Sequence, residues 1–339
     1  MEYDKPFKTY DELIELMVSR NILVSDRSFA KRALSNMSYY TLVNGYKNTF
    51  LSVNGSDVFI PGTKFEELYT IHIIDTSFSS IILKFILHIE HSLKSKISYI
   101  VAKNYGVYTD FSNPVATDKS DYLCLYNYGS STGQRRNILE SINACGIETR
   151  NNLSLLHYKN HKNHVPPWIL IENVPFGLAV KWYNILKGTD KGYVCENLIQ
   201  GSSLPIEAKK ELLLKALYIL KDYRNSIAHG HRTFENITSY ELPKIPLLSI
   251  APDLLSEHEY LSGIGKNDLY SVVIIISILL NDPHLMENFI RDILFTFQPY
   301  LESKVQFCNK SILDVFSLPE DMFERLETFT HNKYISSTR

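Results

Sequence analysis

The sequence has few cysteines and no paired cysteine motif. Its four cysteines, Cys124, Cys145, Cys195 and Cys308, lie far apart in a chain of 339 residues. This spacing argues against a zinc ribbon or a disulfide framework and favours free thiols in a reducing compartment. The polar, charged start of the chain over residues 1–9 does not have the pattern of a signal peptide. We therefore expect a cytoplasmic protein.

Long hydrophobic runs, a strong charge of one sign and glycine-rich loops are also missing. The longest apolar run, 272–280, has about half the length that a membrane span needs, so we expect no membrane association. The formal net charge is -2, so nucleic-acid binding requires a local basic patch. Without a glycine-rich phosphate loop or a paired aspartate motif, nucleotidyl transfer would need a separate enzyme.

Helical periodicity dominates the sequence. Apolar residues recur at three- and four-residue steps, and neither a strand series nor an internal repeat is present. The sequence therefore predicts an all-α protein, with 1–60 as an N-terminal helical segment, 61–235 as a helical domain and 236–339 as a C-terminal helical extension. Helices are expected at 11–20, 65–104, 134–145, 147–158, 174–186 and 205–229, and over much of 268–330.

Several boundaries are predicted from local signals. Ser25 is expected to cap a second short helix, and Gly188 to end the helix that begins near 174. The tract 65–104 would span roughly 60 Å if straight, so we expect a break near Thr76 and Ser77. Residues 113–133 are expected to be irregular, and 241–267 to form a connector.

The helix predicted at 205–229 ends in residues with chemical potential. It carries Arg224, Asn225 and His229, and Gly230 follows where a left-handed residue ends a helix. Arg224 keeps its charge in water, whereas His229 exchanges a proton near neutral pH, and the helix dipole favours its imidazolium form. Metal-independent phosphodiester cleavage needs one group that holds phosphate and one that moves protons. A histidine that only caps the helix is the structural alternative.

The spacing of Arg224 and His229 does not bring the two side chains together by itself. Positions five apart on an ideal helix are separated by roughly 140°. A tight cluster therefore requires that the last turn unwinds or that a second copy of the chain completes the site.

Two other patterns have both a functional and a structural interpretation. Glu90 and Lys94 are spaced as an i,i+4 pair, which we interpret as a surface salt bridge. His157 and His161 are spaced like the histidines of a zinc protease helix, with His164 three residues on, but Tyr158 stands where the catalytic glutamate would be. We expect a solvated or basic loop there, with no metal and no cofactor.

Four blocks of the sequence, in this order, resemble the Abi-like (abortive infection) proteins of bacteria, of the AbiD/AbiF type. They are 5–46, which ends in Ser38-Tyr39-Tyr40 and Gly45-Tyr46; 65–94, with Asp75 and Ile89-Glu90-His91-Ser92-Leu93-Lys94; 166–178, with Pro166-Pro167-Trp168 and Phe176-Gly177-Leu178; and Arg224-Asn225-Ser226-Ile227-Ala228-His229. Residues 240–339 show no comparable match.

These proteins are similar to the HEPN superfamily, all-α domains whose Arg-x4–6-His motif usually marks a metal-independent ribonuclease. The resemblance implies a HEPN-like helical bundle in which Arg224 and His229 are the ends of the catalytic motif and Asn225 is its polar second position. Glu90 is the candidate for an acidic residue on an earlier helix. Lys94 stands where related sequences often have arginine, which keeps the charge but weakens bidentate contacts.

The resemblance also implies partners. We expect an RNA endonuclease toxin of a phage-defence or toxin-antitoxin system, acting as a homodimer and restrained by an antitoxin protein or a regulatory small RNA. Candidates for holding the RNA backbone are Arg135, Arg136, Lys159, Lys162, Lys209 and Lys210. The alternatives are a non-catalytic protein that binds structured RNA, a partner of a separate transferase, and a purely structural helical scaffold.

Overall fold

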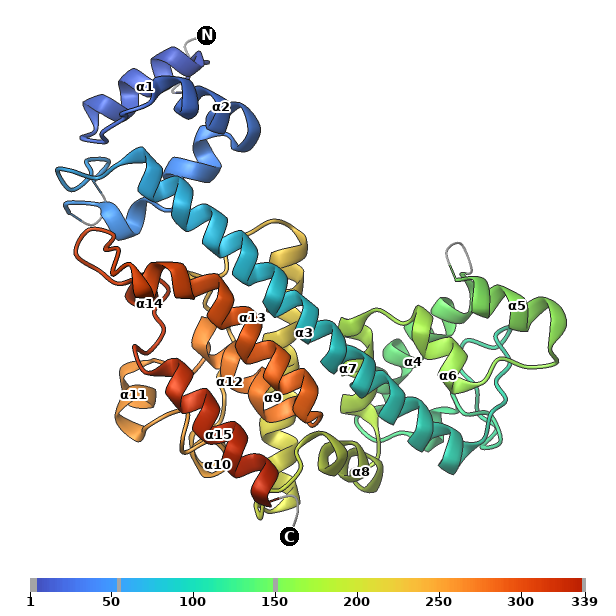
Figure 1. Cartoon of the computed structure of the whole chain (residues 1–339). Coiled ribbons are helices and arrows are strands. Elements are labelled where there is room, and N and C mark those ends of the chain that lie inside the picture. The colour runs from blue at the N-terminus through green and yellow to red at the C-terminus, as the bar shows by residue number, and fades with distance from the viewer. Residues whose placement is uncertain (1–4, 54–55, 149–151, 337–339) are drawn as a thin grey trace.

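The computed structural model describes residues 5–53, 56–148 and 152–336, and its regular secondary structure there is helical, with only isolated bridges of extended backbone (Figure 1). The prediction of an all-α protein is confirmed. The helices are α1 (Tyr10–Ser19), α2 (Arg27–Met37), η1 (Tyr40–Asn44), η2 (Lys47–Phe50), α3 (Phe65–Tyr105), η3 (Leu125–Asn127), α4 (Thr132–Ile147), α5 (Leu153–His161), α6 (Pro167–Leu170), η4 (Ile171–Asn173), α7 (Phe176–Ile185), α8 (Gly188–Leu198), α9 (Ile206–Ala228), α10 (Lys244–Ile250), α11 (Glu257–Ser262), α12 (Leu269–Leu279), α13 (Pro283–Glu302), α14 (Ile312–Val315) and α15 (Met322–Ser336).

The long helix α3 is the axis of the fold, and helices α6, α8, α9, α12 and α13 pack along it. It runs for 41 residues without interruption, so the predicted break near Thr76 and Ser77 is wrong. The hydroxyl of Thr76 donates to the His72 carbonyl at 2.8 Å, and that of Ser80 donates to the Thr76 carbonyl at 2.9 Å. These polar side chains are satisfied on the helix itself, and the stretch has no proline or glycine to kink it.

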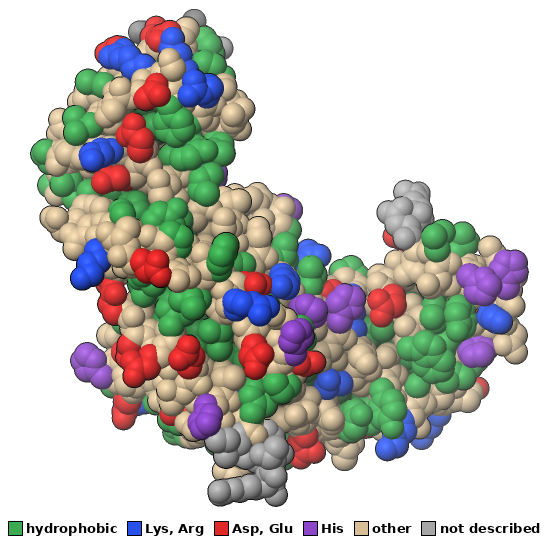
Figure 2. Space-filling view, viewed as in Figure 1, with side chains coloured by type: hydrophobic (Ala, Val, Ile, Leu, Met, Phe, Trp, Pro, Cys, Tyr) green, Lys and Arg blue, Asp and Glu red, His purple; other side chains and the backbone are tan. Residues whose placement is uncertain are grey.

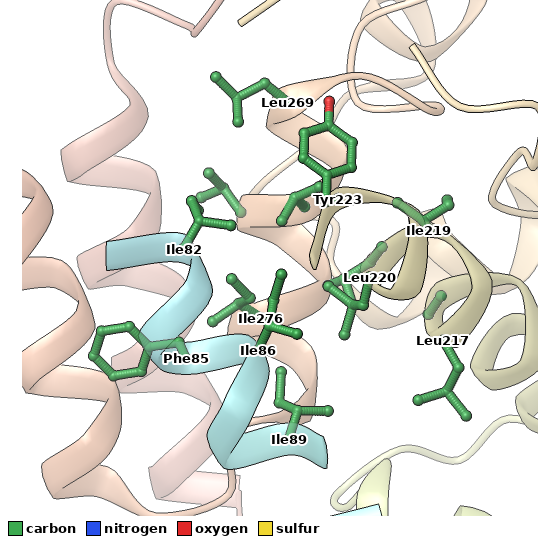
Figure 3. Close-up of a cluster of buried hydrophobic side chains, with 14 of the residues drawn as sticks. Ile82, Phe85, Ile86, Ile89, Leu217, Ile219, Leu220, Tyr223, Leu269 and Ile276 are labelled. Atoms are coloured by element: carbon green, nitrogen blue, oxygen red, sulfur yellow. The ribbon is translucent and has the colours of Figure 1, made fainter. Parts of the chain in front are cut away.

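The core is built where α3 crosses α9 and α12 (Figure 3). Ile82, Ile86 and Ile89 of α3 are buried there with Leu220 of α9 and Ile276 of α12. Burying each of these side chains contributes about 1.5–3 kcal/mol. By length and composition alone, α3 could also cross a membrane, a signature that a buried core helix shares.

Helix α12 lies in the predicted C-terminal extension and is buried at every position, as expected for a helix that is hydrophobic all round. The part of the chain after residue 236 therefore completes the core around α3 and α9. The predicted domain boundaries at 60 and 235 stay a prediction.

Several predicted boundaries are wrong. Asp26, not Ser25, caps α2, because its carboxylate accepts the amide hydrogen of Phe29. Gly188 begins helix α8 instead of ending a helix, and α8 was not predicted. Helices α10 and α11 lie within the expected connector and occupy about half of it. The helix predicted at 147–158 is α5, which starts at Leu153; residues 149–151 lie outside the described ranges.

The molecule has a concave outline in the view of Figures 1 and 2. The lobe that contains α1 and α2 projects from one end of α3, and the lobe that contains α4, α5 and α6 projects near the other end. Between the two lobes, α3 runs across the body, with α9 packed against it.

Candidate functional site

The candidate site lies at the C-terminal end of α9, which closes with a well-formed cap. The amide of Gly230 donates to the Ile227 carbonyl at 2.9 Å, and the amide of His231 donates to the Ser226 carbonyl at 3.0 Å. Gly230 has φ 71°, the left-handed conformation expected at this position. This pair of bonds is a Schellman motif, in which His229 is the C-cap residue. We refer to 229–233 as the cap segment.

The cap displays the candidate catalytic side chains to solvent. Asn225 and His229 are exposed and Arg224 is half-buried. The Arg224 Nη1 atom lies 3.4 Å from the Asn225 Oδ1 atom, and the rings of His229 and His231 have centroids 6.2 Å apart. In the described part of the chain, no hydrogen bond, ion pair or ring contact joins Arg224 to His229. Helix α9 remains regular to Ala228, so its last turn does not unwind to bring them together.

A buried carboxylate on α3 holds the far side of the cap segment. The Asp75 Oδ1 atom accepts hydrogen bonds from the amide (3.2 Å) and the hydroxyl of Thr233. The Asp75 Oδ2 atom accepts one from the Tyr46 hydroxyl at 3.0 Å. The same hydroxyl lies 3.0 Å from the His72 Nδ1 atom, and the Ser79 hydroxyl lies 3.2 Å from that of Thr233. We call these five residues the Asp75 cluster.

The Asp75 cluster shifts the ionisation of its members. Burial raises the pKa of the Asp75 carboxyl, against the hydrogen bonds from Thr233 and Tyr46, which lower it. Burial, together with the negative charge of Asp75, raises the pKa of Tyr46. Burial lowers the pKa of His72, while Asp75 raises it. Three residues after the cap segment, the Asn236 carbonyl accepts a hydrogen bond from the Tyr223 hydroxyl at 2.5 Å.

Sequence reasoning did not assign a role to Asp75, although a signal was present. The residue belongs to the buried face of α3, in a row with Leu68, Ile71 and Phe78. An acidic residue on an apolar helical face must find a hydrogen-bonding partner, because an unpaired buried charge is costly. That pattern identifies Asp75 as unusual without identifying Thr233 or Tyr46 as its partners.

A second group missed from the sequence covers α9 just before the motif. The rings of Tyr218 and Tyr240 stack with centroids 4.6 Å apart. The Nζ atoms of Lys215 and Lys221 lie 5.7 Å and 5.8 Å from the Tyr240 centroid. All four side chains are half-buried, and the Lys221 Nζ atom also pairs with the Asp222 Oδ1 atom at 2.7 Å.

The interpretation of Glu90 and Lys94 as a surface salt bridge is wrong. The Lys94 Nζ atom lies 2.8 Å from the Glu90 Oε1 atom, and each side chain is only 9% exposed. The other carboxylate oxygen, Glu90 Oε2, is buried and has no hydrogen-bond partner among the described residues. In the described ranges, no hydrogen bond or ion pair joins this pair to Arg224, Asn225 or His229, so the structure does not bring the two supporting candidates to the motif.

The six residues predicted to hold RNA do not form one patch. Arg135 and Arg136 lie on α4, Lys159 and Lys162 at the end of α5, and Lys209 and Lys210 at the start of α9. At 1.5 Å per residue, Lys209 is about 22 Å from Arg224 along the helix.

Three of these cations are also engaged within the protein. Arg135 donates to the Tyr128 carbonyl at 3.1 Å and Lys159 to the Ile147 carbonyl at 3.1 Å. Lys210 forms an ion pair with Glu207 at 2.8 Å. Arg136 and Lys162 are exposed and Lys209 is half-buried.

The histidines near the end of α5 do not assemble a metal site in the described part of the chain. The rings of His157 and His161 have centroids 5.0 Å apart, and the His164 Nδ1 atom lies 2.7 Å from the Asn163 Oδ1 atom. Across the described ranges, no three or more His, Cys, Asp or Glu side chains are placed to hold a metal ion together.

Comparison with known proteins gives one match. The model of a family described as Abi-like protein matches residues 32–235, more than half of the chain. The matched region begins within α2, includes Tyr46, Asp75 and Thr233, and ends just after the cap segment. No curated protein and no solved structure shows a significant match.

Proposed function

The chain belongs to the Abi-like (abortive infection) protein family, and on that premise we propose that it is a metal-independent RNA endonuclease acting in bacterial phage defence. The observation that carries the proposal is the cap of α9. It places a permanently charged, half-buried guanidinium together with an exposed amide and an exposed imidazole at one helix end. Those groups supply a base and a stabiliser of phosphate charge for RNA transesterification, in which the nucleophile is the 2′-hydroxyl of the substrate itself.

In the proposed mechanism, His229 removes the proton from an RNA 2′-hydroxyl, which attacks the adjacent phosphorus. The bond to the 5′-oxygen of the next nucleotide breaks, leaving a 2′,3′-cyclic phosphate and a 5′-hydroxyl end. Arg224 stabilises the negative charge that develops on the phosphoryl oxygens. Asn225, whose Oδ1 atom lies 3.4 Å from Arg224 Nη1, orients the guanidinium.

The reaction also needs an acid that protonates the leaving oxygen. One copy of the motif supplies a single histidine, His229, which already acts as the base. We propose that a homodimer brings two motifs together, so that one His229 acts as base and the other as acid. A cytoplasmic nuclease of this kind must be restrained in uninfected cells. An antitoxin protein or a small structured RNA is the proposed regulator.

The first test is cleavage of cellular RNA in the presence of EDTA. We expect the wild type to cut RNA and leave cyclic phosphates. Arg224→Ala and His229→Ala should each lower the cleavage rate by about 100-fold or more. The products are resolved by electrophoresis, and their ends are identified by phosphatase and kinase treatment.

His231→Ala is the matched control, since His231 is exposed on the same cap two residues away. It should retain cleavage. If His231→Ala abolished cleavage and His229→Ala did not, the assignment of the proton-transfer role to His229 would be wrong. If EDTA stopped cleavage by the wild type, the metal-independent mechanism would be wrong.

One observation favours a second candidate, a non-catalytic protein that binds structured RNA. The stacked Tyr218 and Tyr240 rings, flanked by Lys215 and Lys221, form a cationic and aromatic surface next to Arg224. RNA binding that weakens with salt, persists in His229→Ala and occurs without cleavage by the wild type would support this function.

A further inference from the structure

A groove in the N-terminal lobe lies on the other side of the Asp75 cluster from the cap segment. Two cavities, of about 630 Å³ and about 570 Å³, open around α1, η1 and the end of α2. They are neighbours, because Leu13, Ser38 and Tyr39 line both. Each lies within the range of about 300–1,000 Å³ that is typical of ligand sites.

The first cavity is basic and has an aromatic side chain at its edge. It is lined by four cations, Lys5, Lys8, Arg20 and Lys47, and by one carboxylate, Asp57. Asp57 pairs with Arg20 at 3.1 Å and Lys47 at 3.0 Å, so the cavity keeps an excess of positive charge.

Tyr40, also in its lining, is 76% exposed, which leaves its ring face accessible. Tyr40 begins η1, a π-helical turn, and such turns are frequent at functional sites. The preceding Ser38 has φ 60°, a strained value for a residue other than glycine.

The second cavity has a mixed lining, in which His72, Ser35, Asn36 and Thr41 are polar and Leu13, Leu34 and Met37 are apolar. The Tyr46 hydroxyl donates its hydrogen to Asp75, so its oxygen accepts from His72 Nδ1. In that tautomer, Nε2 is the nitrogen left to accept a hydrogen bond from a ligand. The Asp75 carboxylate also accepts a hydrogen bond from the Thr233 amide of the cap segment. The same buried side chain therefore connects the wall of the groove to the cap that carries His229.

We propose that this groove binds a single-stranded segment of RNA, with phosphates against Lys5, Lys8 and Lys47, a base stacked on Tyr40, and a ribose hydroxyl or base edge at His72. Positive charge that follows a backbone, combined with an exposed aromatic ring, is the general basis of single-strand binding. A ribose hydroxyl is the group by which a protein distinguishes RNA from DNA. This inference rests on the proposed function in taking RNA as the ligand, but it concerns a surface outside the motif.

The test measures binding by fluorescence anisotropy of a labelled 12-nucleotide single-stranded RNA, with every protein carrying His229→Ala so that the probe stays intact. We expect Tyr40→Ala to raise the Kd about 10-fold or more, on the scale of one stacked base. The double variant Lys5→Ala/Lys8→Ala should weaken binding and reduce the slope of log K against log salt by about 1.4, since each phosphate contact on a single strand contributes about 0.7. His72→Gln should narrow the difference in Kd between the RNA and its DNA counterpart.

The control variants are Tyr126→Ala and Lys119→Ala, which remove an exposed tyrosine and an exposed lysine far along the chain. They should bind like the parent. If the groove variants also bound RNA like the parent, or if an RNA duplex bound more tightly than the single strand, the groove proposal would be overturned.

The groove proposal and the proposed function can fail separately. Loss of binding in Tyr40→Ala together with unchanged cleavage in Arg224→Ala would support the groove and refute the assigned nuclease site. Cleavage that depends on Arg224 and His229, with groove variants that bind RNA normally, would support the nuclease site and refute the groove. If the parent bound no RNA at all but bound a protein from infected cells through Tyr40, the groove would be a protein-binding surface and the proposal wrong.

Discussion

Two acidic side chains are buried about four turns apart on α3, and the protein accommodates them in different ways. Asp75 receives hydrogen bonds from Tyr46 in the N-terminal lobe and from Thr233 after α9, so its partners come from distant parts of the chain. Glu90 pairs with Lys94, one turn further along the same helix, and one of its carboxylate oxygens has no hydrogen-bond partner among the described residues.

The two carboxylates differ in the chain segments that they connect. The Asp75 cluster connects three chain segments and fixes the cap segment, which displays His229. The Glu90–Lys94 pair neutralises charge within one helix, and no hydrogen bond or ion pair in the described ranges joins it to another element. Removing one member of a buried pair leaves an uncompensated charge, whereas removing a satisfied hydrogen-bond centre leaves several donors without an acceptor.

The largest effect on stability should come from breaking the isolated pair. Lys94→Met leaves the Glu90 carboxylate buried without its cation, and we expect the free energy of unfolding to fall by about 3–5 kcal/mol. The double variant Glu90→Leu/Lys94→Met removes both charges and should be within about 1 kcal/mol of the wild type or more stable. Urea unfolding followed by circular dichroism measures both.

RNA cleavage assays on the double variant then distinguish a structural role of the Glu90–Lys94 pair from a catalytic one. A stable double variant that cleaves RNA normally would show that the pair has no catalytic role, contrary to the role that the family resemblance implies for Glu90. If Lys94→Met unfolded at the same urea concentration as the wild type, the pair would not be a buried charge pair in solution.

The same contrast explains what could be predicted from the sequence. Local patterns were sufficient for the all-α class, for α9 and its Gly230 cap, and for the spacing of Glu90 and Lys94. Burial of that pair depends on the packing of helices around α3, which the i,i+4 pattern does not encode. The unbroken α3 was missed for the same reason, because packing along its length overrides a weak local signal at Thr76.

The candidate site shows more clearly which features the sequence alone does not predict. Arg224 and His229 were visible because they lie on one short stretch of α9. The partners of Asp75 come from Tyr46 and Thr233, which are distant in sequence, so only the folded chain connects them. The groove around Tyr40 and His72 is assembled from α1, α2, η1 and α3, and no single segment carries its pattern.

An intermediate loss of stability is expected from Asp75→Asn. One side of the amide is a donor and faces either Tyr46 or Thr233, so a buried hydrogen-bonding group loses its partner at a cost of about 1–3 kcal/mol. Ser79→Ala, one turn along the same face, removes a single neutral hydrogen bond to Thr233 and should cost about 1 kcal/mol. The free energies of unfolding of the two variants are compared at neutral pH.

The pH dependence of this effect has a definite sign. Because burial raises the pKa of Asp75 in the folded protein, the folded state binds a proton more tightly than the unfolded state. Its contribution to stability is therefore full below the ordinary aspartate value of about 3.8 and is lost as pH rises through the higher folded value. The stability advantage of the wild type over Asp75→Asn should shrink across that interval. An advantage that grows with pH there would show that the hydrogen bonds outweigh burial.

A modest effect on stability, and the most specific effect on the site, should come from Gly230→Ala. No atom lies within 4 Å of the position of an added Cβ atom, so the cost is the left-handed backbone alone, about 1–2 kcal/mol. Gly201→Ala is a matched control, with φ 69° and equally open surroundings, but it lies before α9 and away from the motif. We expect equal losses of stability from the two variants and a fall in RNA cleavage only for Gly230→Ala, because relaxation of its backbone displaces His229 from the cap. Equal cleavage by the two variants would show that the position of His229 does not depend on the Schellman cap, and that the anchor at Asp75 and Thr233 is sufficient to hold it.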